Sequence, residues 1–365
     1  MKITAIEPML VRVPLREPVH GVHGLTSLQE SVLVRVTTDA GPEGWGNVDP
    51  TPGYSKVTAE RVHAMVERLA PRLAGTDALD IETAHARMAQ DAAAASEARA
   101  AVEMALLDLK ARARGMPLHA LLGARVKDTV TLNAWIGTVA PAQAAREAVA
   151  WGERGFRTAK IKISGATDEG VERVAAVRAA VGERMALRVD FNESLTLEQA
   201  PAFIRRLEPY ALTLVEQPIP RTEIAGLARI RAEIGIPLMA DESVTDDAAL
   251  AEIIRLGAAD LVKVKVMKQG GLLPTLTTIG RAKAAGLRVV LGHGFGLTLS
   301  TIAEATVAAV SDAVIDGCEA VGPLKMAGDV VANPARLDAG VIHLPDSPGL
   351  GAEIDPKALD RYRVR

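Results

Sequence analysis

Carboxylate side chains recur at the ends of apolar runs in the middle of the chain. Asp190, Glu216 and Asp241 each directly follow a short apolar segment. These segments recur roughly every 25 residues, a spacing typical of parallel strands joined by crossover helices. Side chains at the carboxyl ends of the strands of a parallel barrel meet at one mouth. We therefore expect the three carboxylates to converge.

Three crowded, buried carboxylates repel one another, and a divalent cation removes that repulsion. An all-oxygen ligand set without Cys or His favours a hard ion, here Mg²⁺ with Mn²⁺ as a substitute. The alternative is a structural network in which each carboxylate pairs with a lysine. Because the carboxylates follow three consecutive strands, we predict that Asp190, Glu216 and Asp241 are metal ligands.

Lysines flank the three carboxylates along the chain. Lys160 and Lys162 precede them, and Lys263 and Lys265 follow them. Residues two apart on a strand share a face, so each pair points one way. A neighbouring ammonium and a divalent cation lower the pKa of a lysine, which makes it a usable base near neutral pH. A single such lysine is more simply a solvated surface charge, but the pairing predicts catalysis.

The predicted reaction begins with removal of the α-proton of a carboxylate substrate. A metal bound to the substrate would acidify this proton and stabilise the resulting enediolate. Lys162 and Lys265, on opposite faces of the substrate, would allow removal on one side and return on the other.

The first ~125 residues predict an α+β unit. Residues 2–13 and 31–37 alternate as strands do, and helices are expected at 56–74, 80–95 and 96–114. Between the two strands, at about residues 15–30, His20 and His23 lie in a glycine-containing segment. We expect either a lid whose histidines contact substrate or a polar surface hairpin.

From residue 126 to about 320, apolar strands alternate with amphipathic helices. Strands are expected near residues 130 (129–136), 160, 188, 214, 239, 262, 290 and 316, and helices at 169–181, 197–207, 223–234, 246–256, 272–285 and 298–310. Eight such strands would close a (β/α)₈-type barrel. The segment 321–365 predicts two short strands, near 329–331 and 340–344, and is expected to return to the N-terminal unit.

Composition limits the function classes. The chain has 365 residues, is 48% hydrophobic and carries a formal net charge of −3, which argues against a nucleic-acid surface. The single cysteine, Cys318, forms no internal disulfide, which fits a reducing compartment. The N-terminus lacks the apolar core of a signal peptide, and no apolar run would span a bilayer. We expect a cytoplasmic protein without a nucleic-acid or membrane partner.

The ordered motifs resemble the enolase superfamily, in its muconate-lactonizing subgroup (the mandelate racemase/muconate lactonizing enzyme family). They are Lys160-Ile161-Lys162, Asp190-Phe191-Asn192, Val215-Glu216-Gln217-Pro218, Ala240-Asp241-Glu242-Ser243, the segment 260–271 and the helix 101–109. The resemblance covers nearly the whole chain. It implies an α/β fold, a modified TIM barrel of (β/α)₇β type, with an α+β capping domain at 1–125, a barrel domain at 126–320 and a C-terminal segment at 321–365.

The resemblance also implies site roles. By it, Asp190, Glu216 and Asp241 hold Mg²⁺, Lys162 and Lys265 are the acid/base pair, and Lys160 is a helper lysine. The loop near residues 20–25 would close over substrate. It further implies a homo-oligomer that acts on a small-molecule carboxylate.

Three residues depart from the family pattern and bear on the substrate. His293 would replace a hydrogen-bonding partner or only line the mouth. Lys263 stands where the subgroup often has Asn, and would lower the pKa of Lys265 further or contact a second substrate anion. Glu319 would bind a substrate ammonium or guanidinium, or pair with a lysine. The predicted substrate-binding set is His20, His23, Asn192, Lys263, His293 and Glu319.

The leading prediction is a Mg²⁺-dependent racemase or epimerase of a small carboxylate or an N-substituted amino acid. The alternative is a muconate-type (lactonizing) cycloisomerase, in which only one lysine need move a proton. Dehydration of a β-hydroxy acid comes third. Outside this chemistry stand an aldolase that uses a Schiff-base lysine and a barrel kept only for structure or binding.

Overall fold

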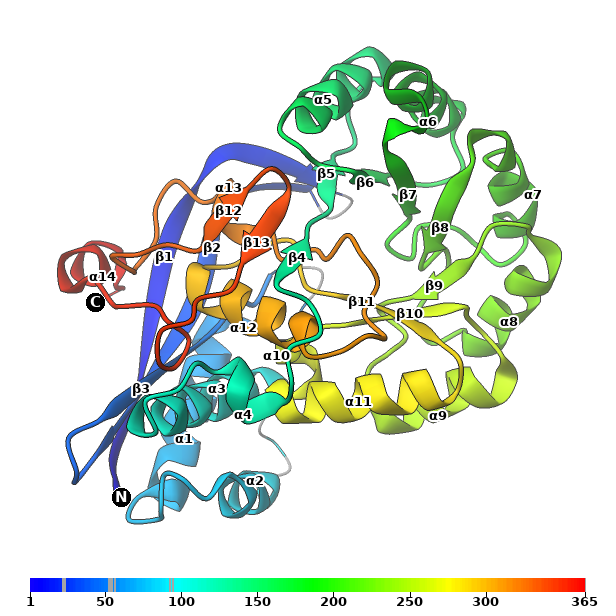
Figure 1. Ribbon diagram of the computed structural model, residues 1–365. Helices are drawn as coiled ribbons and strands as arrows, with labels where there is room; N and C mark the ends of the chain where they lie inside the picture. The colour runs from blue at the N-terminus through cyan, green and yellow to red at the C-terminus, as the bar shows by residue number, and fades with distance from the viewer. Residues whose placement is uncertain (22–23, 52–54, 56, 92, 94, 365) are drawn as a thin grey trace.

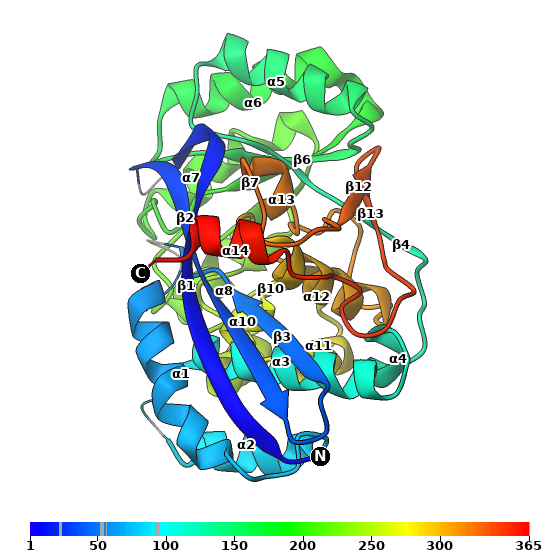
Figure 2. The ribbon, with the colours of Figure 1, turned by 90° about the vertical axis from the view of Figure 1, so that its left-hand side faces the viewer.

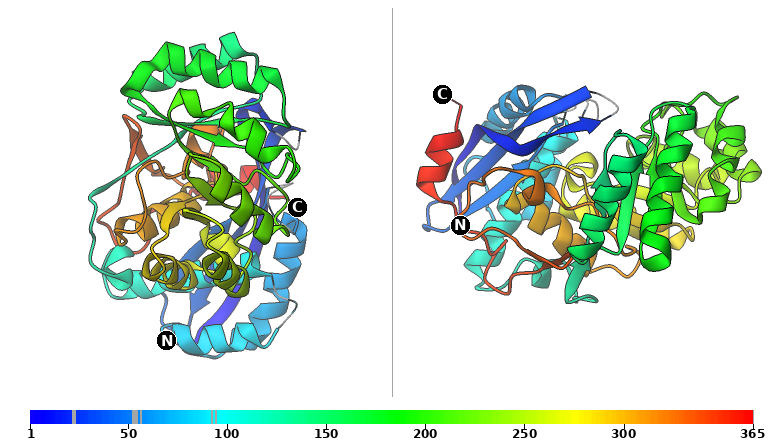
Figure 3. Two further views of the ribbon diagram at one scale, coloured as in Figure 1. Left: turned by 90° about the vertical axis from the view of Figure 1, so that its right-hand side faces the viewer. Right: turned by 90° about the horizontal axis from the view of Figure 1, so that it is seen from above.

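The computed structural model describes residues 1–364 except 22–23, 52–54, 56, 92 and 94. An antiparallel sheet with its helices lies beside a curved parallel sheet that is surrounded by helices (Figure 1). Figure 3 shows the same two parts from the side and from above. None of the helices in the described part of the chain is long and apolar enough to span a membrane.

The N-terminal sheet has the order β1-β2-β3, with β1 at Ile3–Gly21, β2 at Gly24–Thr38 and β3 at Glu43–Val48. Three helices accompany it: α1 at Ala59–Leu73, α2 at Ile81–Ala89 and α3 at Ser96–Ala113 (Figure 2). Helix α3 packs directly on β3 because Gly44 and Gly46 have no side chain. A Cβ at Gly44 would lie 2.1 Å from the Ala105 carbonyl oxygen. The predicted α+β unit is thus observed.

Of the two alternatives for residues 15–30, a lid and a surface hairpin, the described residues form a hairpin that continues the two strands. β1 and β2 pair as far as Gly21 and Gly24, with an irregularity between Pro14 and Val19. His20 lies in β1 opposite Leu25, and His23 lies outside the described residues. Most described side chains near the end of this hairpin are exposed. Because the end of this hairpin has no buried face, apolar and polar residues do not alternate along its sequence. The sequence therefore does not identify this segment as two strands.

The parallel sheet has seven strands in chain order: β5 Ala134–Ile136, β6 Thr158–Lys162, β7 Ala186–Asp190, β8 Leu212–Glu216, β9 Leu238–Ala240, β10 Leu261–Val264 and β11 Arg288–Leu291. The helices are α5 Pro141–Glu153, α6 Asp168–Val181, α7 Ala200–Arg205, α8 Ile224–Glu233, α9 Asp247–Leu256, α10 Val266–Gln269, α11 Leu272–Ala284 and α12 Thr298–Ala309. Two 3₁₀ turns lie at Gly182–Arg184 and Glu208–Tyr210. This alternation confirms the modified barrel.

Both ends of the barrel differ from the regular pattern. The predicted strand at 129–136 is split: β4 (Thr129–Thr131) pairs with the C-terminal segment, and only β5 joins the barrel. The expected eighth strand near 316 forms isolated bridges, from Val314 to Val289 and from Cys318 to Leu132. These bridges connect the two edge regions of the sheet, so the eighth position is occupied by an irregular segment.

The C-terminal segment returns to both parts of the molecule. It contains α13 (Gly322–Lys325), β12 (Arg336–Asp338), β13 (Val341–His343) and α14 (Pro356–Tyr362), while α4 (His119–Leu122) precedes the barrel. The predicted strand at 340–344 is found, but the one at 329–331 is wrong, since Val331 forms only a bridge to Ile354. Helix α14 lies beside β1 (Figures 1 and 2), where the Val364 amide donates to the Leu10 carbonyl.

A buried carboxylate joins the N-terminal unit to the barrel. Glu103, on α3, is fully buried and accepts hydrogen bonds from the amides of Leu272 (2.6 Å) and Leu273 (3.0 Å), at the first turn of α11. These amides have no partner within their own helix, and a carboxylate also suits the positive end of the helix dipole. Gly271 leaves the required space: its φ is 142°, and a Cβ there would lie 2.4 Å from a Glu103 oxygen.

We predict that Glu103→Gln lowers the free energy of unfolding by about 1–3 kcal/mol. The glutamine side chain is uncharged, and its NH₂ group would face one of the two backbone N–H groups that Glu103 now accepts from. Urea denaturation followed by circular dichroism measures the change. The matched control is Glu82→Gln on the exposed surface of α2, which should stay within about 0.5 kcal/mol of the parent. Equal stability of the two variants would show that Glu103 does not join the two parts.

Candidate active site

The order of the barrel strands brings the predicted carboxylates together. β6 to β10 are consecutive neighbours in the sheet. Lys162 at the end of β6 pairs in register with Asp190 at the end of β7, which in turn pairs with Glu216 at the end of β8. Asp241 directly follows β9, and Lys265 directly follows β10. Five charged residues thus lie along one edge of the sheet, as predicted.

Lysine ammonium groups stand between these carboxylates. Lys160 Nζ lies 3.0 Å from Asp190 and 3.3 Å from Glu216. Lys263 Nζ lies 3.0 Å from Glu216 and 3.7 Å from Asp241. All five side chains are buried. We call the three carboxylates Asp190, Glu216 and Asp241 the carboxylate row.

The carboxylate row does not form a ready cluster around one point. Among the residues that the structure describes, no three His, Cys, Asp or Glu side chains are placed to hold a common metal ion. The ammonium groups of Lys160 and Lys263 separate the carboxylates instead. This arrangement is the lysine-paired alternative that the sequence left open, and a cation at this place would have to displace at least part of it.

The two lysines predicted for proton transfer contact opposite ends of the carboxylate row. Lys162 Nζ lies 2.6 Å from Asp190, and Lys265 Nζ lies 2.8 Å from Asp241. Lys162 also donates to Asn192 Oδ1 at 2.5 Å. Each lysine is therefore held by a carboxylate from a neighbouring strand, and three strands separate the two.

The lowered lysine pKa that the sequence suggested is not found at Lys265. Burial by itself lowers the pKa of this ammonium, but attraction to Asp241 and Glu242 outweighs burial and raises the pKa above its usual value. Lys160 behaves in the same way, because Asp190, Glu216 and Glu319 outweigh its burial. In this arrangement both lysines are protonated.

The carboxylates respond to their surroundings in opposite directions. At Glu216, burial and repulsion from Asp190 outweigh its two lysines and raise the pKa to about 8. At Asp190, burial acts in the same sense but Lys160 and Lys162 outweigh it, so its pKa is lowered. The central carboxylate of the row is thus the one whose negative charge is least well compensated.

Glu319 pairs with lysines rather than projecting as a free charge. Its Oε2 accepts from Lys160 at 2.7 Å and from Lys263 at 2.5 Å. These contacts outweigh burial and lower the pKa of Glu319 to about 2. Its Oε1 is buried and has no hydrogen-bond partner in the structure as described. Of the two alternatives for Glu319, lysine pairing is the one observed.

Gln217 is a positioning residue that the sequence analysis missed. Its Oε1 accepts from the amides of Asp241 (3.0 Å) and Ser243 (3.2 Å), and its Nε2 donates to the Ser243 hydroxyl. The backbone of Gln217 is left-handed, with φ at 35°, as is that of Asn192 at 43°. Such conformations are strained in residues with a side chain and occur often at functional sites. The sequence did offer a signal for this role, because the side-chain amide of Gln217 directly follows the predicted ligand Glu216.

Lys268 and Glu242 also belong to the site. Both lie within the sequence motifs, but the sequence predicted no role for either. Lys268, on α10, lies 2.9 Å from Asp241 Oδ1, and burial lowers its pKa to about 8. Glu242 accepts from Asn192 Nδ2 at 3.0 Å, and its other oxygen is buried without a hydrogen-bond partner among the described residues. Burial raises the pKa of Glu242. Asn192, predicted to bind substrate, thus links Lys162 to Glu242.

His293 lies just after β11 and faces the N-terminal unit. Its Nε2 is 3.7 Å from Asp49 Oδ2, and Asp49 follows β3. Asp49 also accepts from the hydroxyls of Ser31 and Ser300, both at 2.5 Å. The backbone amide of His293 donates to the buried Glu304. The contact with Asp49 means that His293 does more than line the mouth: it also joins the barrel to the other unit.

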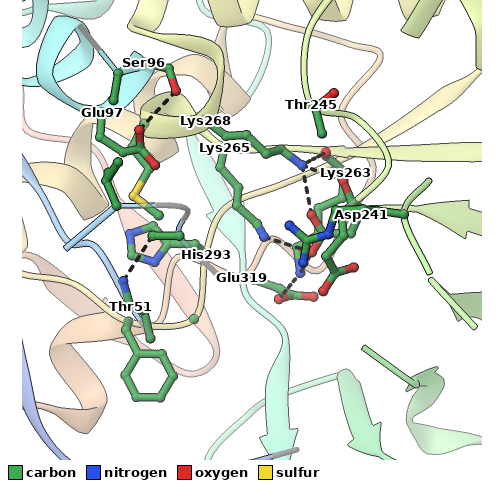
Figure 4. A pocket seen from close by; sticks show the side chains of 18 of the residues that line it. Thr51, Ser96, Glu97, Asp241, Thr245, Lys263, Lys265, Lys268, His293 and Glu319 are labelled. Carbon is green, nitrogen blue, oxygen red and sulfur yellow. Dashed lines mark hydrogen bonds and ion pairs between the residues drawn. The ribbon is translucent and has the colours of Figure 1, made fainter. Parts of the chain in front are cut away.

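A cavity of about 420 Å³ lies between the barrel mouth and the N-terminal unit. Its described lining includes Lys160, Lys162, Lys263, Lys265, Lys268, His293 and Glu319 from the barrel, and Thr51, Met65, Ser96 and Glu97 from the N-terminal unit. Figure 4 shows Lys263, Lys265 and Lys268 gathered around Asp241, while His293 lies nearer to Thr51. Of the predicted substrate-binding residues, Lys263, His293 and Glu319 line this cavity; the side chain of His20 and the whole of His23 are outside what the structure describes.

Comparisons with known proteins agree with this geometry. Residues 4–123 match the family model described as the mandelate racemase/muconate lactonizing enzyme N-terminal domain, and residues 142–358 match the model described as enolase C-terminal domain-like. The N-succinyl-L-Arg/Lys racemase of Bacillus cereus is 31% identical over 100% of this chain and 98% of its own length.

Two solved structures are also similar over almost their whole length. The muconate lactonizing enzyme of Pseudomonas fluorescens, complexed with muconolactone, has a TM-score of 0.96 and 30% identity, covering 100% of this chain and 99% of its own. The dipeptide epimerase of Enterococcus faecalis, complexed with Mg and L-Leu-L-Tyr, has a TM-score of 0.92 and 28% identity, covering 97% and 100%. This chain therefore belongs to the mandelate racemase/muconate lactonizing enzyme family of the enolase superfamily, and it is an isomerase.

Proposed function

We propose that this isomerase is a metal-dependent racemase or epimerase of a small carboxylate, with an N-substituted amino acid as the favoured substrate type. One observation carries the proposal: Lys162 and Lys265 contact opposite ends of the carboxylate row and line the same cavity. A substrate between them would present one face of its α-carbon to each lysine. A relative that is 31% identical is a racemase of N-succinyl amino acids, which supports this choice.

The metal would be Mg²⁺ or Mn²⁺, held by Asp190, Glu216 and Asp241. The donor chemistry fits a hard cation, because three buried carboxylates on consecutive strands supply only oxygen ligands. The present lysine contacts must loosen on loading, since ammonium groups separate the carboxylates. When bound, such a cation would contact the substrate carboxylate and acidify its α-proton. The similar dipeptide epimerase structure, which contains Mg, supports this assignment.

The chain's own groups divide the remaining work. One of Lys162 and Lys265 takes the α-proton in its neutral form, and the other, protonated, delivers a proton to the opposite face. The Asp190 and Asp241 contacts orient the two ammonium groups, and Asn192 holds Lys162 from the side. Lys160, buried between Asp190 and Glu216, would stabilise negative charge that develops on the substrate.

Cycloisomerisation of a muconate-type diacid is the second candidate. It is supported by the likeness to a muconate lactonizing enzyme that covers this whole chain. In that reaction only one lysine need move a proton. The two candidates therefore differ in how many lysines are essential for proton transfer. Dehydration of a β-hydroxy acid follows as a third.

We predict that Lys162→Gln and Lys265→Gln each reduce racemisation by about 10²–10⁴-fold, because each removes one proton-transfer group. Each variant should still exchange the α-proton of one enantiomer with deuterated solvent, and the two variants should act on opposite enantiomers. Proton NMR in D₂O, with separate enantiomers from a library of N-acyl amino acids, measures this exchange.

The parent protein and Lys283→Gln, an exposed substitution on α11, serve as controls with full exchange of both enantiomers. Lactonisation of muconate that survives the loss of one lysine would favour the cycloisomerase. If the magnesium-loaded parent exchanges no α-proton in the library, the racemase proposal fails. Borohydride trapping of a carbonyl substrate on a lysine, unaffected by EDTA, would indicate aldolase chemistry instead.

We predict that Asp241→Asn weakens Mg²⁺ binding by about 100-fold or more, since it removes a charged ligand. Isothermal titration calorimetry with MgCl₂ measures the affinity without any need for turnover. The matched control is Asp247→Asn, an exposed position on α9, which should leave the affinity unchanged. Unchanged Mg²⁺ affinity in Asp241→Asn would contradict the metal assignment.

A further inference from the structure

Lys325 is a buried ammonium that the proposed reaction does not use. It is the last residue of α13, its residue exposure is 6%, and it lines the active-site cavity. In the structure as described, its Nζ has neither a hydrogen bond nor an ion pair, in contrast to Lys160 and Lys263, which each contact two carboxylates or more. A buried amino group without a hydrogen-bond acceptor is costly, so it calls for an explanation.

Two aromatic rings hold this ammonium in place. Lys325 Nζ lies 4.4 Å from the centre of the Trp135 ring and 4.1 Å from that of Phe295. Trp135 is itself packed against Trp151, with ring centres 4.4 Å apart. The faces of the rings attract the cation, but they accept none of the conventional hydrogen bonds that its three N–H groups can donate. The rings therefore position Lys325 and leave its donors available to a ligand.

The charges around Lys325 favour an anion as that ligand. Burial, together with repulsion from Lys162, Lys160 and Lys263, holds the pKa of Lys325 well below its usual value. Glu319 is the carboxylate that attracts it, but Glu319 Oε2 already accepts from both Lys160 and Lys263. A bound carboxylate would supply both the countercharge and the hydrogen-bond acceptors that the pocket does not provide.

We propose that Lys325 is a specificity residue that binds a second carboxylate of the substrate, remote from the α-carbon. The substrate class is then a dicarboxylate, such as an N-acyl amino acid whose acyl group ends in a carboxylate. This inference rests on the proposed function, because it assumes that the first carboxylate occupies the metal end of the cavity. It also separates this chain from relatives whose substrates carry a free ammonium, because Glu319, the carboxylate that attracts Lys325, is already paired with Lys160 and Lys263.

The test measures binding, without turnover, of matched pairs of compounds to the full-length magnesium-loaded protein. The pairs are N-succinylglycine with N-butyrylglycine, adipate with hexanoate, and glutarate with pentanoate; each pair differs by one terminal carboxylate. We expect at least one dicarboxylate to bind about 10- to 100-fold more tightly than its partner, as a charged hydrogen bond would give. Isothermal titration calorimetry provides the affinities.

Lys325→Met keeps the apolar stem of the side chain and removes the charge, whereas Lys325→Arg keeps the charge. In Lys325→Met the preference should fall to less than about threefold, with the monocarboxylate affinity nearly unchanged; Lys325→Arg should keep most of the preference. Far-ultraviolet circular dichroism and thermal unfolding confirm that both variants fold. If Lys325→Met fails to fold, the dicarboxylate preference is compared among the parent, Lys325→Arg and Lys325→Gln. Lys325→Arg should then keep most of the preference and the uncharged Lys325→Gln should lose it.

The proposal is wrong if no dicarboxylate in the panel is preferred by the parent, or if Lys325→Met retains the preference. It is also wrong if a keto acid and borohydride trap a covalent adduct on Lys325, because Lys325 would then be a nucleophile. Failure of the proposed function looks different: the parent would prefer a dicarboxylate yet exchange no α-proton. Exchange of α-protons without any dicarboxylate preference would overturn only the assignment of Lys325.

Discussion

The alternation of ammonium and carboxylate groups at the barrel mouth is the constraint on which the rest of the structure depends. Asp190, Glu216 and Asp241 are almost completely buried, and so are the lysines between them. Burying either set alone would cost several kcal/mol per charge. The alternation therefore requires that the five strands from β6 to β10 end at the same level, and the strand register provides this.

The N-terminal unit packs against the barrel and completes the wall of the active-site cavity. Glu103 caps α11 and Asp49 lies beside His293, so two contacts join the N-terminal unit to the barrel, and the C-terminal segment adds the contact of α14 with β1. The cavity between them takes its charged groups from the barrel and part of its remaining wall from the N-terminal unit. The cavity therefore combines side chains from both parts of the chain. Lys325 also lines this cavity, apart from the carboxylate row and between two aromatic rings.

Much of the fold was predictable from local patterns. Buried parallel strands are short apolar runs, and their regular alternation with amphipathic helices identified the barrel. The wrong strand predictions fall in segments where buried and exposed side chains do not follow a regular period along the sequence. The eighth barrel position has only isolated bridges at Val314 and Cys318, and the strand expected near Val331 is a single bridge. In such segments backbone pairing is set by tertiary neighbours and leaves little trace in side-chain order.

The sequence by itself determined which charged groups end successive strands, and hence that Asp190, Glu216 and Asp241 would converge at one edge of the sheet. It determined the family as well, since the ordered motifs span the chain. Only the tertiary structure decided which polar groups meet: Glu319 with Lys160 and Lys263, Gln217 with the amides of Asp241 and Ser243, and Lys325 with two aromatic rings. The physical reason is that the pattern of strands along the chain shows which charged residues stand at strand ends. Which partner each of them contacts depends on distances of a few ångströms between elements that are remote in sequence.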